Sequence, residues 1–343
     1  MNYIAYSANF DIAYPFDSEG THSFLFYADK YFSEAGYKFI PLDECLKNGV
    51  VPAALICFNV PRKNDEQEIN MLLAGWGDKI KCSAVFLMEP QTILGRNWKY
   101  SKHEQYDVIF TWRSDLVDDK KYFWLNYSQP LVADFSSVPF SDKKLCVMIA
   151  GNKSSYHPAE LYSERVAAIR WFEKNQPDHF DLYGRGWDLH IIKYPKAIRS
   201  LRRYPVINRW LYKPFSSYRG EVKEKADVLH RYKFSICYEN SREDFDYITE
   251  KIFDSFLSGC VPVYLGATNI EQRIPEGAFI DMRKFSGYSE LFEYISTMGE
   301  RSYLTYLDNI RNFLHGPEAD PYRPENVAKI LVDTMVGKMV ADG

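Results

Sequence analysis

The sequence has no long hydrophobic run, no CxxC pair and no excess of basic residues, and each absence excludes a class of protein. No apolar run approaches the roughly 20 residues that a membrane-spanning helix requires. The 343 residues carry a formal net charge of -4, which argues against a nucleic-acid-binding protein. No internal repeat, low-complexity tract or GxGxxG motif occurs. Because the first residues show neither a basic segment nor a signal-like apolar core, we expect a cytoplasmic chain.

The cysteines and histidines do not form a metal or disulfide pattern. The six cysteines lie mostly inside apolar, strand-like segments, which predicts buried reduced thiols instead of a disulfide framework. The seven histidines are scattered without the spacing of metal ligands. We therefore expect no metal site and no required cofactor.

The chain is long enough for two domains, each with its own core. Strand and helix patterns alternate along it without hairpin signals, which predicts α/β domains with parallel sheets. A polar stretch near residues 130–144 predicts a linker. This places an N-terminal α/β domain at residues 1–138, a second at 139–320, and a C-terminal helix within 321–343.

The most informative stretch runs from Tyr232 to Phe285 and predicts a strand, a helix and a second strand. Lys233–Tyr238 is a short apolar run with the length of a buried strand. From Thr249 to Leu257 the apolar residues follow a helical period, and Cys260–Leu265 forms another apolar run. A βαβ unit of this kind predicts two parallel strands that are neighbours or nearly so.

Polar residues gather at one end of this predicted unit. Glu239 and Asn240 follow the first strand, and Glu250 and Lys251 fall in the first turn of the helix. Ligands of open parallel sheets bind at the carboxyl ends of the strands, near helix N-termini. A lysine in a first turn is unfavourable for the helix dipole, so Lys251 indicates an anionic ligand. The alternative is that Glu250 and Lys251 belong to a solvated helix face.

A second short motif points to different chemistry. Asp244-Phe245-Asp246 is a DxD sequence, in which paired carboxylates could hold a divalent cation on a diphosphate. The alternative is that Asp246, or Thr249 after it, caps the predicted helix.

The segments YENS, DYITEK, VPVYLG and FID, in this order, resemble the donor-binding signature of the α1,3/4-fucosyltransferases. The resemblance is strong over about residues 218–285 and weak elsewhere. It implies a GT-B fold, with two Rossmann-like domains that face each other across a cleft. It also implies a GDP-fucose donor, inversion at the anomeric carbon, and a C-terminal helix that packs back on the first domain.

The resemblance also implies roles for individual residues on the donor side. Lys251 and Arg185 are expected to bind the diphosphate, since an arginine between two glycines lets the main chain approach a phosphate. Glu250 is expected to accept hydrogen bonds from the ribose. Asn240 and Tyr247 match positions that line the donor site, although Tyr247 could instead be a core aromatic residue.

The general base is expected in the first domain. Glu89 follows an apolar strand and precedes Pro90, which places its carboxylate at the edge of the sheet that faces the cleft of a GT-B fold. The resemblance here rests on a carboxylate, a polar turn and then Asn97. The competing candidates lie in the N-terminal loop and are Asp11, Asp17, Glu19 and His22.

The sequence therefore predicts an inverting transferase that moves L-fucose from GDP-fucose to a glycan. The acceptor would be an oligosaccharide or glycolipid, with an α1,3 linkage to GlcNAc or Glc, as in a bacterial-type surface glycan such as lipopolysaccharide. The rival functions are transfer from another GDP-sugar and non-catalytic binding of a sugar nucleotide or carbohydrate. The basic segment 193–213 predicts a charged loop over the donor site or, alternatively, peripheral contact with an anionic membrane.

Overall fold

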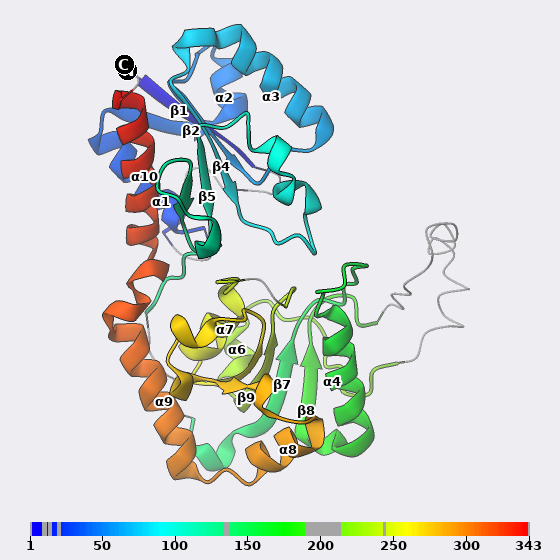
Figure 1. The fold of residues 1–343 in the computed structure, drawn as a ribbon. Coiled ribbons are helices and arrows are strands. Elements are labelled where there is room, and N and C mark those ends of the chain that lie inside the picture. The colour runs from blue at the N-terminus through cyan, green and yellow to red at the C-terminus, as the bar shows by residue number, and fades with distance from the viewer. Residues whose placement is uncertain are drawn as a thin grey trace, which may run out of the picture. The chain divides into compact units, whose positions relative to one another are not determined.

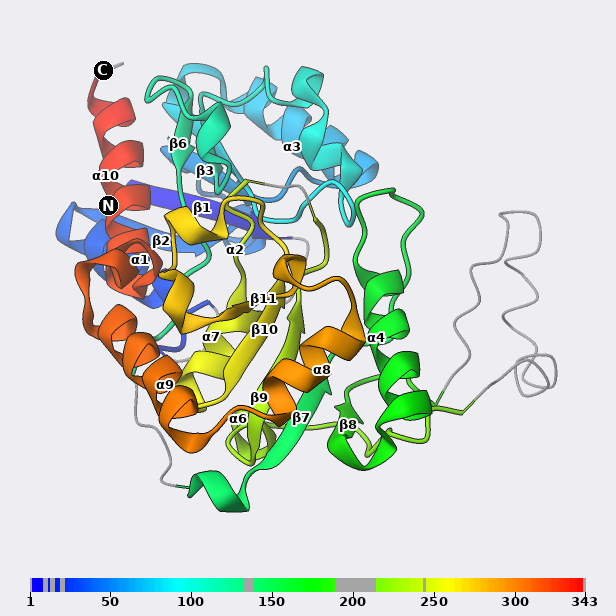
Figure 2. The same cartoon turned by 60° about the horizontal axis from the view of Figure 1, so that its bottom comes forward.

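The computed structural model divides the chain into two compact α/β units. Unit 1 comprises residues 1–131, 244–250 and 317–343, and unit 2 comprises residues 132–243 and 251–316. Each unit holds one parallel sheet with helices packed around it (Figures 1 and 2). The predicted fold class, with two parallel α/β sheets, is confirmed. The structure describes residues 2–8, 12, 16–18, 22–132, 138–188, 214–242 and 245–341.

Unit 1 contains a six-stranded parallel sheet with the order β2-β1-β3-β4-β5-β6. Every residue of β3 and β4 is buried, which explains why both strands are almost entirely apolar. The strand order reverses between β1 and β3, and ligands of such sheets bind near a reversal. The strands are Asn2–Ala8 (β1), Tyr37–Pro41 (β2), Ala54–Phe58 (β3), Cys82–Leu87 (β4), Val108–Thr111 (β5) and Tyr122–Trp124 (β6).

Two helices from opposite ends of the sequence, α1 and α10, lie side by side in unit 1 (Figure 1). Ala28 and Phe32 of α1 share a core cluster with Leu331 and Met335 of α10. The helix predicted near the C-terminus is therefore present. The α-helices are Phe24–Glu34 (α1), Leu42–Lys47 (α2), Lys63–Trp76 (α3) and Pro324–Ala341 (α10). The 3-10 helices are Gly77–Lys79 (η1), Gly95–Trp98 (η2), Tyr100–Lys102 (η3), Ser114–Leu116 (η4) and Pro317–Tyr322 (η11).

Unit 2 contains a five-stranded parallel sheet with the order β11-β10-β9-β7-β8, which reverses between β7 and β9. Its strands are Lys144–Ile149 (β7), Phe180–Tyr183 (β8), Tyr232–Tyr238 (β9), Val261–Leu265 (β10) and Ile280–Asp281 (β11). Its α-helices are Tyr162–Asn175 (α4), Ala226–Leu229 (α6), Glu250–Leu257 (α7), Tyr288–Ser296 (α8) and Glu300–His315 (α9). Its 3-10 helices are Phe140–Asp142 (η5), Pro177–His179 (η6), Ile270–Gln272 (η8), Glu276–Ala278 (η9) and Met282–Lys284 (η10).

The predicted βαβ unit is formed by β9, α7 and β10. The two strands are parallel neighbours, with Tyr238 paired in register with Leu265. Helix α7 ends at Leu257, and Gly259 follows with φ +58, a left-handed conformation that suits glycine at the end of a helix. The prediction for this stretch is confirmed, with bounds that differ by one residue at the helix start and at each strand.

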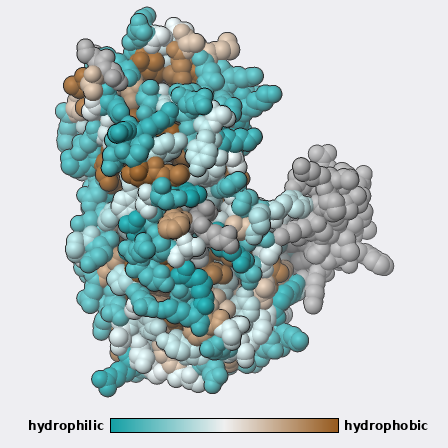
Figure 3. Space-filling model, in the orientation of Figure 1, coloured by the Kyte–Doolittle hydropathy of each residue, from teal (hydrophilic) through white to brown (hydrophobic). Residues whose placement is uncertain are grey.

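The sequence also led to predictions about the cysteines, membrane-spanning helices and metal sites. All six cysteines, which lie in the described part of the chain, are buried thiols. On the face drawn in Figure 3, apolar side chains show as limited patches among hydrophilic ones. Among the described residues, no helix is long and apolar enough to span a bilayer, and no group of three or more His, Cys, Asp or Glu is suited to hold a metal. The basic segment 193–213 and three candidate carboxylates lie outside the described residues: Asp11, Glu19 and Asp244.

Candidate active site

In unit 1 the main chain around Glu89 is held on both sides by buried amide side chains. Glu89 follows β4 and is half-buried. Its N–H donates to Oδ1 of Asn59 at 2.9 Å. Its carbonyl accepts from Nδ2 of Asn97 at 3.1 Å and from the indole N–H of Trp98 at 3.0 Å. These bonds fix the direction in which the Glu89 side chain leaves the sheet edge.

The side chains of Asn59 and Asn97 are hydrogen-bonded to each other. Nδ2 of Asn97 donates to Oδ1 of Asn59 at 2.7 Å, and Oδ1 of Asn97 accepts from the Val60 N–H at 2.9 Å. Asn59 has φ +66, a conformation that asparagine tolerates better than most residues. Asn97 was expected near Glu89 from the sequence, whereas Asn59 and Trp98 were not. Asn59 could have been found, since it is a polar residue directly after an apolar strand at the same sheet edge.

The structure describes two of the four N-terminal candidates for the general base, Asp17 and His22. The imidazole of His22 has a lowered pKa because it is buried, and the nearby Glu250 carboxylate opposes that shift. The structure therefore brings His22 close to Glu250, both within unit 1. Asp17 is exposed, and the remaining two candidates are outside the described residues.

The segment before α7 belongs to unit 1. Asp246 is 2% exposed with φ +59, and its carboxylate accepts from the backbone N–H of Ser114 at 3.1 Å and from the Ser114 hydroxyl. Thr249 occupies the position directly before α7, where a cap is expected. Asp246 therefore holds this segment on η4, a role that neither the metal nor the capping hypothesis anticipated.

Tyr247 packs as a core aromatic residue. Its side chain is 1% exposed, and its ring centroid lies 4.9 Å from that of Trp112 and 6.2 Å from that of Tyr127. This favours the packing interpretation that the sequence left open for Tyr247. It also braces the short segment that carries Glu250, the half-buried first residue of α7.

In unit 2 the sequence-predicted residues cluster where β9 ends and α7 begins. Nζ of Lys251 lies 3.1 Å from Oε2 of Glu239, whose side chain has no exposed surface. The sequence analysis left Glu239 without a role, and the structure makes it the partner of Lys251. Asn240 is half-buried, and its Oδ1 accepts from Nη2 of Arg165 at 3.0 Å.

Arg185 lies in a tight turn after β8. Gly184 and Gly186 have φ +125 and +79, and a Cβ on Gly184 would lie 2.0 Å from the Ala150 carbonyl oxygen. The N–H of Asn152 donates to the Arg185 carbonyl at 2.9 Å, which joins this turn to the loop after β7. The Arg185 side chain is 89% exposed, with Nε 3.4 Å from Glu221. The main chain of this turn is held by the hydrogen bond to Asn152 and by the close approach of Gly184 to Ala150, while the guanidinium remains accessible to a ligand.

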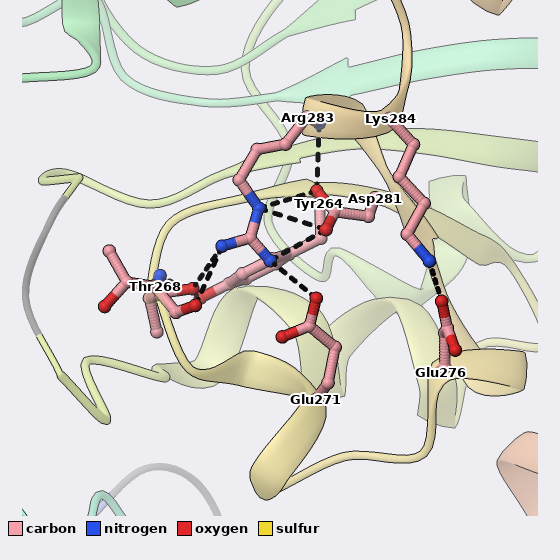
Figure 4. Close-up of polar contacts among 8 residues, drawn as sticks. Tyr264, Thr268, Glu271, Glu276, Asp281, Arg283 and Lys284 are labelled. Carbon is pink, nitrogen blue, oxygen red and sulfur yellow. Dashed lines mark hydrogen bonds and ion pairs between the residues drawn. The ribbon is translucent and has the colours of Figure 1, made fainter.

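The loop after β10 is braced by Arg283 (Figure 4). Arg283 binds both carboxylate oxygens of Asp281, donates to the Thr268 carbonyl at 2.9 Å, and lies 3.3 Å from Glu271. A Cβ on Gly266 in this loop would lie 2.6 Å from Cγ of Glu239, so the loop presses against the partner of Lys251. No sequence pattern predicted this network.

The family model described as "Glycosyltransferase family 10 (fucosyltransferase) C-term" matches residues 188–316. This range contains the end of β9 and the start of α7, with Asn240, Tyr247, Glu250 and Lys251. This segment is similar to the C-terminal part of family 10 fucosyltransferases. The resemblance predicted from the sequence is confirmed.

Curated fucosyltransferases match over limited stretches. The "Alpha-(1,3)-fucosyltransferase FucT" of Helicobacter pylori is 33% identical over 113 residues, which are 32% of this chain and 23% of that protein. The "4-galactosyl-N-acetylglucosaminide 3-alpha-L-fucosyltransferase 9" of Mus musculus is 40% identical over 95 residues, 26% of either chain. The matches thus span about a quarter of the length of these relatives.

Solved structures match over nearly the whole chain. An α1,3-fucosyltransferase with GDP-fucose has a TM-score of 0.51 at 14% identity, covering 98% of this chain and 90% of that one. Anabaena HepE with UDP-glucose has a TM-score of 0.57 at 9% identity, covering 98% and 100%. At these identities the likeness shows the fold alone, and that fold is GT-B.

Proposed function

We propose that this chain is a family 10 enzyme that transfers L-fucose from GDP-fucose to a hydroxyl of a glycan, with an α1,3 linkage to GlcNAc or Glc. The observation that carries the proposal is the family match over residues 188–316, which contains the Glu239–Lys251 pair and Asn240. The names of these two relatives support the donor sugar and the linkage, since both describe 3-fucosyltransferases.

The proposed reaction is a single displacement with inversion. The acceptor oxygen attacks the anomeric carbon of fucose, its proton passes to the Glu89 carboxylate, and the bond from that carbon to the diphosphate breaks. GDP leaves with both electrons of this bond. Glu89 suits the role of base because Asn59 and Asn97 fix its main chain, and a base must be held at a set position to accept the proton.

The leaving diphosphate carries the charge that develops, and positive groups at the carboxyl edge of unit 2 would stabilise it. We assign this role to Lys251 and Arg185, with Glu250 accepting hydrogen bonds from the ribose. Asn240 completes the proposed donor contacts, and Tyr247 supports the segment that carries Glu250 through its packing on Trp112. Because two cations serve the diphosphate, we propose that the reaction needs no divalent metal.

A donor screen tests the proposal. The purified chain is incubated with a glycan array and with GDP-fucose, GDP-mannose or UDP-glucose, and products are identified by mass spectrometry. Fucosylated products that depend on Glu89 support the proposal. Transfer from GDP-mannose alone would favour a different GDP-sugar, and nucleotide binding without any product would favour a binding protein.

A further inference from the structure

A buried arginine lies beneath the proposed donor contacts in unit 2. Arg165 belongs to α4 and is 4% exposed. Its guanidinium reaches the end of β9, where Nη2 donates to the carbonyls of Tyr238 at 2.6 Å and Glu239 at 2.9 Å, and Nε donates to Tyr238 at 3.2 Å. It also lies over the Tyr162 ring, 5.0 Å from the centroid. These contacts fix the guanidinium against the strand end.

The same guanidinium determines how the Asn240 amide is oriented. Nη2 of Arg165 lies 3.0 Å from Oδ1 of Asn240. A guanidinium donates hydrogen bonds and never accepts them, so the amide atom that faces it must be the oxygen. The NH2 group of Asn240 is therefore on the side away from Arg165.

The main chain at Asn240 is held by the same helix. The carbonyl of Asn240 accepts from the N–H of Leu161, the residue before α4, at 3.1 Å. Glu160 and Ser241 form an antiparallel bridge next to it. Both the backbone and the side-chain oxygen of Asn240 are thus fixed from α4, which leaves the amide little freedom to rotate.

We propose that Arg165 is a positioning residue that turns the NH2 group of Asn240 toward the nucleotide, where it donates to an oxygen of the diphosphate or of its sugar. The inference rests on the proposed function. A guanidinium is an expensive group to bury, and an apolar side chain could pack α4 against β9 equally well. Its multiple donors in one plane explain why arginine occupies this site.

Asn240→Asp tests the orientation directly. The aspartate keeps an oxygen for Arg165, and the new charge pairs with the guanidinium, so thermal unfolding should stay near the wild-type temperature or rise. The NH2 donor is lost and a negative charge faces the phosphates, so GDP affinity should fall by about tenfold or more. An aspartate variant that binds GDP as well as wild type would overturn the inference.

A double-mutant cycle tests whether Arg165 acts through Asn240. Arg165→Lys keeps the charge but loses the planar fork, and we expect about tenfold weaker GDP binding. In the Asn240→Ala background the same change should weaken binding by less than about threefold. Equal losses in both backgrounds would mean that Arg165 only supports the fold. Arg170→Lys, on the same helix and paired with Glu173 at 2.7 Å, is the matched control and should leave GDP affinity unchanged.

The two proposals fail in different ways. If the wild-type chain binds UDP or ADP but not GDP, the proposed donor is wrong, while the Asn240→Asp comparison still tests the orientation with the nucleotide that binds. If wild type uses GDP-fucose and Asn240→Asp binds GDP normally, the proposed function stands and the role of Arg165 is rejected. Calorimetry with GDP, UDP and ADP measures nucleotide binding, and the donor screen measures the use of GDP-fucose.

Discussion

The ammonium of Lys251 lies 3.1 Å from the carboxylate of Glu239, and the two side chains are 21% and 0% exposed. The pair is asymmetric, because Lys251 keeps contact with water and Glu239 does not. Lys251 also stands in the first turn of α7, where the helix dipole disfavours a cation. Glu239 therefore supplies a negative charge that compensates the ammonium at this position.

This asymmetry predicts unequal effects on stability. Lys251→Met leaves a fully buried carboxylate without its ammonium, which should cost about 3–5 kcal/mol in the free energy of unfolding. Glu239→Gln should cost less, since Lys251 can turn toward solvent, and the double variant should recover part of the loss. Urea unfolding of the three variants provides the test. Asp254→Asn is the control. Asp254 also lies on α7, and its ion pair with Lys225 is more exposed, so this change should lower the free energy of unfolding by under about 1 kcal/mol. A Lys251→Met chain as stable as Glu239→Gln would contradict the argument.

Arg185 offers a clearer test of diphosphate binding than Lys251 does. Its side chain is 89% exposed, so Arg185→Ala should change the free energy of unfolding by no more than about 0.5 kcal/mol. Loss of a charge-assisted contact should weaken GDP binding by about 1.5–3 kcal/mol, which is roughly ten- to a hundredfold. Calorimetry measures the change. Arg311→Ala, which removes an exposed ion pair on α9, is the matched control. Unchanged GDP affinity in Arg185→Ala would place the diphosphate elsewhere.

Glu89→Gln should separate binding from chemistry. The amide keeps the shape of the side chain and the main-chain bonds to Asn59 and Asn97, so the variant should fold and bind GDP-fucose normally. Without the proton acceptor, kcat should fall by about 10²–10⁴-fold. Steady-state kinetics with GDP-fucose and an acceptor measure this, with Glu104→Gln as an exposed control in the same unit. If kcat stays near normal, Asp11, Asp17, Glu19 and His22 become the candidates.

Catalysis should continue after chelation. Lys251 and Arg185 are expected to neutralise the diphosphate, so activity in EDTA should match activity without it. The measurement is initial rate before and after dialysis against EDTA, followed by addition of manganese or magnesium. Loss of activity on chelation that manganese restores would promote Asp244 and Asp246 to metal ligands.

The sequence by itself determined the elements that depend on neighbouring residues. Short apolar runs and the helical period of 3.6 are properties of neighbouring positions, so β9, α7 and β10 could be predicted together with their parallel pairing. The positions of Glu239, Asn240 and Lys251 at one sheet edge followed from the same reasoning. Glu89 was placed after its strand by the same local pattern.

The tertiary structure decided which distant residues hold that edge in place. Asp246 binds Ser114, which is 132 positions away in the sequence, and Asn240 accepts from Arg165, which is 75 positions away. Neither contact leaves a periodic signal, because each depends on strand order and on how a helix packs against the sheet. No sequence pattern singled out Arg165, and only the fold places the first turn of α4 against the end of β9. A one-dimensional pattern records which face of an element is apolar, whereas the partner of a buried polar group is fixed by the assembled fold.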